Sequence, residues 1–272
     1  MPHLIRSTFS TRKFWHIVFM ILLPACSLTS RSTLNTPTPE FVFKPTPVPA
    51  TIPALTPTDI PPTDIPPTVS PEPTPDLNFF RDDFIETLDP QWSWMREDPR
   101  NWSLVNIPGS LQINVGRGYV PAHNNSNLLL RPAPEGNFQV ETQINFSPAD
   151  NFQFAGLIIY ESDSNFIQAG RGYCTAVGCI GEGLYMDYYK RGVVVKPNFG
   201  HSYKDTNPIL LRLNRRGNNY TFEASTEGKV WFIIGSHTSD INPVQIGLVA
   251  GQRLEGGILP AQFEYFEVRS LP

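Results

Sequence analysis

The sequence has few charged residues, few cysteines and no long apolar run. Only 17% of its 272 residues are charged, the formal net charge is −4, and three residues are cysteine. This balance excludes a strongly basic nucleic-acid binder, so we expect no nucleic-acid partner. No run reaches the roughly 18 consecutive apolar residues that indicate a membrane-spanning helix. A protein that crosses the membrane several times is therefore excluded as well.

Glycine is absent from the N-terminal part of the chain, where proline is concentrated. All 19 glycines lie at or after Gly109, whereas 14 of the 28 prolines lie between Pro37 and Pro75. A single globular domain would mix the two residues, so at least two parts of different physical character share the chain. The roughly 195 residues after the proline-rich part are enough for one domain with a substantial core.

Residues 1–25 have the pattern of an export signal. Basic residues precede a run, 14–25, that is apolar except at His16 and too short to span a bilayer comfortably. The run ends in Leu23-Pro24-Ala25-Cys26, which resembles the lipobox of bacterial lipoproteins, although Pro24 stands where Ala, Ser or Thr is more usual. The resemblance implies cleavage before Cys26 and lipidation of its thiol. The alternative is an ordinary signal peptide followed by an incidental cysteine.

Residues 26–77 are predicted to be a spacer that begins with the lipidated cysteine. From Thr36 to Asp76 the sequence is mostly Thr and Pro, and it contains the tandem pentapeptides Thr58–Pro62 and Thr63–Pro67. Dense proline removes backbone donors and fixes φ, so neither helix nor sheet can propagate. An extended polyproline II chain would reach on the order of 100 Å, and plain disorder is the alternative. In both cases this disordered linker holds the folded part away from the membrane.

Two cysteines remain in the folded part, Cys174 and Cys179. Because an exported protein resides in an oxidising compartment, we expect these two neighbours to form a disulfide. Zinc is the alternative, but neither a second cysteine pair nor a histidine cluster lies nearby in the sequence.

Residues 78–272 have the period-two pattern of β-strands. A continuous apolar stretch, Phe154–Tyr160, is interrupted only by Gly156 and fits a strand buried on both faces. Turn signals at 216–219 and 227–229 separate neighbouring strands. Apolar residues alternate with others at 140–146, 209–213, 220–224, 230–234 and 244–250. The pattern predicts an all-β fold, a two-sheet antiparallel jelly-roll sandwich.

Several motifs between Phe79 and Val268 occur in an order typical of one family. They include Asp82-Asp83-Phe84, Leu88–Trp94, Asn127–Pro132, Ala155–Tyr160 and Ala261–Phe266. The set resembles the concanavalin A-like module at the C-terminus of many family 43 β-xylosidases and arabinofuranosidases. Ser225–Trp231 is also similar to a hairpin of the DUF1349 family. The resemblance implies a concanavalin A-like fold. In those glycosidases a catalytic propeller precedes the module, whereas here the linker does.

The sequence predicts no catalytic centre. Jelly-roll glucanases use carboxylates spaced along one strand, and the nearest approach is Glu161 with Asp163. Phe166 occupies the place of a third acid, so we interpret the pair as part of a solvated loop. The sequence also has no Gly-x-Ser-x-Gly elbow, and the three histidines of this part are scattered. We interpret His123, His201 and His237 as surface or turn residues.

One strand carries a candidate ligand-binding patch. Along Gly183–Lys190, Tyr185, Asp187 and Tyr189 share a face opposite Leu184, Met186 and Tyr188. Aromatic faces beside polar groups suit sugar recognition, so we predict a patch that also includes Arg171, Tyr173 and His201. An ordinary half-buried strand with tyrosines reaching to solvent is the alternative. For Trp92 and Trp94, core packing is the better interpretation.

The resemblance to concanavalin A-like sandwiches also implies a structural calcium ion, which many of them bind near their termini. Asp82 or Asp83 in the first strand and Glu264 in the last offer hard oxygen ligands. The same acids could instead be edge charges that discourage sheet pairing.

These observations predict an extracytoplasmic lipoprotein, anchored in the cell membrane or the outer membrane by its N-terminal lipid. It displays a non-catalytic sandwich that binds a polysaccharide or oligosaccharide. Two alternatives stay open: a glycoside hydrolase-like enzyme, and a structural or protein-interaction module of the cell envelope.

Overall fold

The computed structural model describes residues 79–206 and 208–272. The predicted signal peptide, the lipidation site Cys26 and the Thr/Pro-rich linker therefore lie outside the described residues. Within the described residues, no helix is long and apolar enough to cross a membrane.

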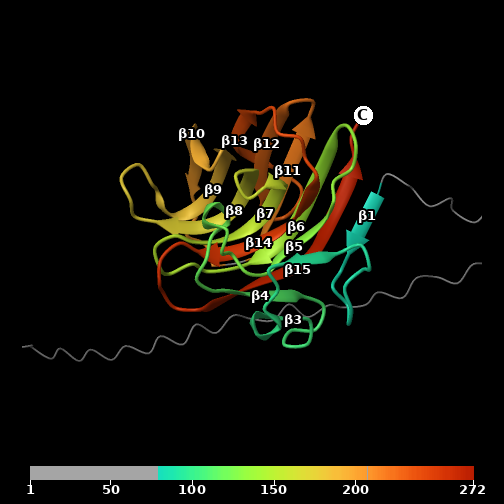
Figure 1. Cartoon of the computed structure of the whole chain (residues 1–272), viewed down its shortest axis with the longest axis vertical. Coiled ribbons are helices and arrows are strands. Elements are labelled where there is room, and N and C mark those ends of the chain that lie inside the picture. The colour runs from blue at the N-terminus through green and yellow to red at the C-terminus, as the bar shows by residue number, and fades with distance from the viewer. Residues whose placement is uncertain (1–78, 207) are drawn as a thin grey trace, which may run out of the picture. The chain divides into compact units, whose positions relative to one another are not determined.

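The described residues form two antiparallel sheets (Figure 1). The eight-stranded sheet has the order β13 (Phe232–Thr238), β12 (Asn219–Ser225), β11 (Ile209–Arg216), β6 (Phe138–Asn145), β15 (Leu259–Ser270), β4 (Leu111–Val115) and β3 (Trp102–Ser103), with β1 (Phe79–Asp82) paired to β15. The seven-stranded sheet has the order β10 (Val193–Ser202), β9 (Gly181–Lys190), β8 (Asn165–Cys174), β7 (Gln153–Ser162), β14 (Gln245–Gln252), β5 (Leu128–Pro132) and β2 (Ser93–Met95). Two short 3-10 helices, η1 (Pro99–Asn101) and η2 (Val120–Ala122), lie in the connections.

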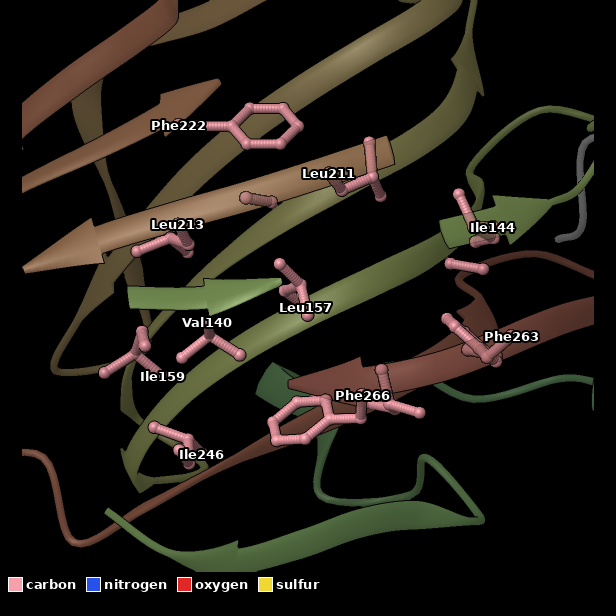
Figure 2. Packing of buried hydrophobic residues seen from close by; sticks show 14 of the residues in the cluster. Val140, Ile144, Leu157, Ile159, Leu211, Leu213, Phe222, Ile246, Phe263 and Phe266 are labelled. Carbon is pink, nitrogen blue, oxygen red and sulfur yellow. The ribbon is translucent and has the colours of Figure 1, made fainter. Parts of the chain in front are cut away.

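The core lies between the two sheets, as the alternating pattern predicts. Val140, Thr142 and Ile144 of β6 are fully buried, whereas Glu141 and Gln143 between them are half-buried. Figure 2 shows such residues from both layers packed together, among them Leu211, Leu213, Phe222, Phe263 and Phe266 from one sheet and Leu157, Ile159 and Ile246 from the other. The predicted two-sheet sandwich is confirmed.

A second apolar cluster covers part of the outer face of the seven-stranded sheet. Val120 of η2 packs there against side chains of β5, β7, β8 and β14, including Ile158, Phe166 and Val249. This cover explains why β7 is buried on both faces from Ala155 to Tyr160, as its unbroken apolar run predicts. The remaining outer face, over β8 to β10, is where the candidate site lies.

The predicted alternation over 230–234 is wrong at its start. Val230 is 80% exposed, and β13 begins only at Phe232. A register irregularity between Phe222 and Glu223 of β12 shifts the pairing with β13, and the buried positions of β13 are Gly235 and His237. A bulge of this kind changes which face a side chain takes, so the alternation of Phe232 and Ile234, which pack against the core, does not continue beyond Ile234.

Candidate functional site

A groove of about 680 Å³ lies on the outer face of the seven-stranded sheet. Its floor comes from β8 and β9, and its sides come from the segment around η2, the start of β7, the turn between β8 and β9, and β10. The lining includes Tyr119, Asn125, Phe152, Phe154, Gln168, Tyr173, Val177, Ile180, Tyr185, Asp187, Tyr189, Lys196, Asn198, Phe199 and Arg253. The groove therefore combines aromatic rings, amides and a few charged groups.

Strand alternation turns one row of β9 toward this groove. Leu184, Met186 and Tyr188 are almost completely buried in the core between the sheets. Because successive side chains of a strand point to opposite faces, Tyr185, Asp187 and Tyr189 point away from that core. All three line the groove, together with Tyr173. The structure thus brings together four of the predicted patch residues, while ligand binding by them stays a prediction.

The carboxylate of Asp187 lies at the centre of this row. Asn198 donates to its Oδ1 at 2.7 Å, and Gln168 donates to its Oδ2 at 3.2 Å. Burial raises the pKa of Asp187, although these two amides and the charge of Lys196 oppose the shift. Each carboxylate oxygen accepts one of these two hydrogen bonds and has a second lone pair, so it can also accept a hydroxyl hydrogen from a ligand.

The tyrosine rings of the row are held in fixed positions. Tyr189 stacks on Phe166 with ring centroids 4.7 Å apart and an angle of 14° between the planes. The hydroxyl of Tyr185 donates to the carbonyl oxygen of Gly181. Burial raises the pKa of both phenols above the ordinary 10, so their ionisation is suppressed further. Rigid, neutral aromatic faces beside a carboxylate suit the binding of a polyhydroxylated molecule.

Arg171 and His201 do not belong to this patch, so that part of the prediction is wrong. Strand pairing places both opposite Leu184, on the side that faces the other sheet. Arg171 is completely buried there, where it donates to Glu182 Oε1 at 2.8 Å and to the carbonyl oxygen of Asp205. The ring of His201 lies 5.1 Å from that of Phe232.

Several lining residues escape prediction from the sequence. Asn198 and Lys196 lie where the pairing of β10 with β9 shifts between Val195 and Phe199, which places them at the groove. The motif Lys196-Pro197-Asn198 marks a strand interruption and could have indicated this. Arg253 follows β14, far along the chain, and no local pattern connects it with β9.

The predicted disulfide is confirmed. Cys174 and Cys179 are bonded, with their Cα atoms 5.5 Å apart. The turn that they close lies against the groove, which Val177 and Ile180 line. The disulfide therefore fixes one end of the candidate site.

Asp163 is not part of a solvated loop, which corrects the interpretation of the pair Glu161 and Asp163. Its side chain is only 12% exposed, and Arg96 binds both of its oxygens at 2.8 and 3.1 Å. His123 and Tyr160 each lie at 2.9 Å from it. Burial by itself would raise the pKa of Asp163, but these partners outweigh it and the net shift is downward. A carboxylate held ionised in this way is a structural anchor.

The acids proposed for calcium have protein partners. The carboxylate of Asp82 accepts hydrogen bonds from the backbone of Phe84 and Asp89 and from Trp92 Nε1. Asp83 pairs with Arg81 at 2.6 Å. Among residues 79–206 and 208–272, no group of three or more His, Cys, Asp or Glu side chains could hold a metal ion. Calcium binding by Asp82, Asp83 and Glu264 stays a prediction, and the hydrogen-bonded Asp82 fits it poorly.

Known proteins share this domain. Residues 81–269 match a family model described as the beta xylosidase C-terminal concanavalin A-like domain. A non-reducing end alpha-L-arabinofuranosidase from Bacteroides ovatus is 25% identical over 209 residues, which is 70% of this chain and 37% of that protein. A xylan 1,3-beta-xylosidase from a Vibrio species is 27% identical over 164 residues, 57% of this chain and 29% of that protein.

Solved structures show the same fold. A GH43 protein from Bacillus licheniformis superposes with a TM-score of 0.63 at 22% identity, covering 72% of this chain and 40% of that one. This chain thus spans well under half the length of the curated relatives that it matches. Because the family match covers more than half of the chain, the protein belongs to the family of concanavalin A-like domains found at the C-terminus of beta-xylosidases.

Proposed function

We propose that residues 78–272 bind carbohydrate without cleaving it, and that the groove on the seven-stranded sheet is the binding site. The row of Tyr185, Asp187 and Tyr189 along its floor is the observation that carries the proposal. A flat ring contacts the C–H face of a pyranose or furanose, and a neighbouring carboxylate accepts from its hydroxyl groups. The fixed positions of these side chains reduce the entropy that binding costs.

The relatives indicate the class of sugar. They are named as an alpha-L-arabinofuranosidase and as a xylan 1,3-beta-xylosidase. Because this chain matches only part of each protein, their activities are not carried over to it. We propose oligosaccharides of xylose and arabinose as the ligands to test first.

The charges in the groove favour binding over hydrolysis. Among the described lining residues, Asp187 is the one carboxylate. Both inverting and retaining glycosidases need two carboxyl groups flanking the bond to be broken. Asp163 belongs to the pair of acids that comes nearest to a catalytic pattern in the sequence. Its carboxylate is bound by the side chains of Arg96, His123 and Tyr160. We therefore propose a non-catalytic role.

We further propose that the protein is exported and anchored to a membrane through lipid on Cys26. The motif Leu23–Cys26 after a basic, apolar segment supports this proposal. The disulfide Cys174–Cys179 agrees with an oxidising compartment. The linker of residues 26–77 would then display the binding domain at the cell surface, in the cell membrane or the outer membrane.

Calorimetric titration of the full chain in detergent with xylo- and arabino-oligosaccharides tests the binding site. We expect Tyr185→Ala to weaken binding by about tenfold or more, because it removes the aromatic platform. Trp231→Ala is the matched control, since Trp231 is an aromatic residue outside the groove lining. Absence of binding to every sugar, or equal binding by parent and Tyr185→Ala, would overturn the proposal.

The same samples separate the two alternatives. Release of new reducing ends during incubation with the sugars would establish an enzyme. A blank sugar panel together with a specific partner recovered from the cell envelope would instead favour a protein-interaction module.

A further inference from the structure

The groove contains an arginine that lies near two aromatic rings and has no acidic partner among the described residues. The guanidinium of Arg253 lies 5.5 Å from the ring centre of Tyr119 and 5.5 Å from that of Phe152. Both aromatic residues line the groove with it. Arg253 is exposed, and within the described residues no carboxylate pairs with it and no acceptor receives its N–H groups. The planar set of N–H donors of Arg253 is therefore available to bind a ligand in the groove.

A second cation, Lys196, lines the groove from β10. It is exposed and forms no ion pair with any described residue. Its charge acts on Asp187 through space without a direct contact. Lys196 thus adds positive potential beside the row on β9.

The charges of the lining residues sum to a positive value. Arg253 and Lys196 stand against the one carboxylate, Asp187, although the whole chain has a net charge of −4. Asp187 also receives hydrogen bonds from Asn198 and Gln168, which spread its charge over two amides. A neutral sugar can accept hydrogen bonds from these two cations but leaves their charges uncompensated, whereas a carboxylate neutralises charge and binds the arginine fork through two parallel hydrogen bonds.

We propose that the groove binds an oligosaccharide that carries a carboxylate, a uronic acid, with Arg253 as the carboxylate-binding residue. The inference rests on the proposed function, because it names the ligand class of the same groove. The guanidinium lies 5.5 Å from the ring centres of both Tyr119 and Phe152, a distance at which cation–π attraction favours this position. Lys196 contributes a weaker, salt-sensitive attraction.

Matched probes that differ only in charge provide the test. One pair is xylotetraose with a single glucuronic acid branch and the same molecule after reduction of its carboxyl group to an alcohol. A second pair, trigalacturonic acid and its reduced form, changes the backbone. Titration calorimetry uses the full chain in detergent at low and high salt.

We expect the acid form of at least one pair to bind about tenfold more tightly than the reduced form, and high salt to shrink this advantage. Arg253→Gln should abolish the advantage, and Arg253→Lys should restore part of it, because lysine keeps the charge but not the fork. Lys196→Gln should reduce it less. Lys229→Gln removes one positive charge outside the groove lining and should leave it unchanged.

The outcomes distinguish this inference from the proposed function. Equal affinity for acid and reduced forms overturns the uronic acid inference and leaves carbohydrate binding standing. Failure of all four probes and of the neutral sugars overturns both. An advantage that persists in Arg253→Gln, with the melting temperature of the parent, overturns the assignment of Arg253.

Discussion

At the scale of single residues, the ionised carboxylate of Asp187 lowers the stability of the fold, whereas the proposed sugar binding uses it. Burial raises its pKa above the ordinary 3.8, so the folded state favours the neutral acid. The stability contributed by this group is therefore present at low pH and is lost as the pH rises from 3.8 toward the raised pKa. We expect the free energy of unfolding of Asp187→Asn, compared with that of the parent at the same pH, to be more favourable at pH 7 than at pH 4. We also expect the variant to bind sugar about tenfold more weakly than the parent.

Urea unfolding of parent and variant at both pH values measures this difference. Asp240→Asn is the control, because a hydrogen bond with Lys190 lowers the pKa of Asp240. Its stability relative to the parent should therefore be lower at pH 7 than at pH 4, the opposite of the change expected for Asp187→Asn. If Asp187→Asn followed the pH dependence of the parent, the half-buried carboxylate of Asp187 would not have the raised pKa described here.

His237 is a second residue whose burial has a measurable effect. The sequence predicts a surface or turn position for it, but it is only 5% exposed, and its ring packs edge-on against Tyr188 and Phe199. Burial lowers the pKa of His237 below the ordinary 6.5. The unfolded chain then takes up the proton first, so stability is lost as the pH falls from 6.5 toward the lowered pKa.

Replacement of this histidine should remove that loss. We expect the melting temperature of His237→Phe to fall less than that of the parent between pH 7 and pH 5, because phenylalanine keeps the aromatic packing and has no proton to bind. Thermal unfolding followed by circular dichroism measures this. His201→Phe, at an exposed position, should behave as the parent does. An unchanged pH dependence in His237→Phe would contradict the prediction.

The position of a single residue could be predicted from the sequence where a local pattern determines it, and could not where it depends on the pairing of distant segments. Alternation along one strand determines that Tyr185, Asp187 and Tyr189 share a face. It does not determine that Arg171 is paired with Leu184 and so faces the core, because strand register is a property of two segments. Arg253 reaches the groove only through the folding of the whole chain.

At the scale of elements, regular strands could be predicted and irregular ones could not. β6, β11 and β12 keep the alternation of buried and half-buried residues that their sequences show. β10 and β13 contain register irregularities, which insert residues into the count and defeat a period of two. The bulge of β10 also places Lys196 and Asn198 at the groove, so this part of the site could not be predicted.

Close approach of two strands makes Gly247 of β14 indispensable. A Cβ atom at this position would overlap the backbone carbonyl of Leu129 on β5. We expect Gly247→Ala to lower the free energy of unfolding by about 2 kcal/mol or more, because main-chain atoms must shift. Gly116→Ala is the control, since its new methyl group would lie 4.0 Å from the nearest atom, the carbonyl oxygen of Asn114. Chemical denaturation compares them, and equal stability of the two variants would contradict this account.

At the scale of the whole molecule, the two-sheet sandwich could be predicted from the sequence, but the order of the strands in each sheet could not. Many short alternating strands with turn residues between them leave few other ways to bury apolar faces. The order of the strands does not follow the order along the chain, because β15 at the C-terminus lies between β6 and β4. Such pairings join segments more than a hundred residues apart, and no local pattern records them.

Membrane anchoring is the prediction that concerns the complete chain. We expect the parent protein to incorporate a radiolabelled fatty acid and to sediment with membranes, because lipid chains contribute about 0.8 kcal/mol per buried CH₂ group. Cys26→Ala removes the acceptor thiol and should abolish labelling altogether. The double variant Cys174→Ser, Cys179→Ser loses the disulfide and should label as the parent does. Labelling that survives in Cys26→Ala, or a parent protein that takes up no label, would refute lipidation at this cysteine and leave an ordinary export signal as the explanation of residues 1–25.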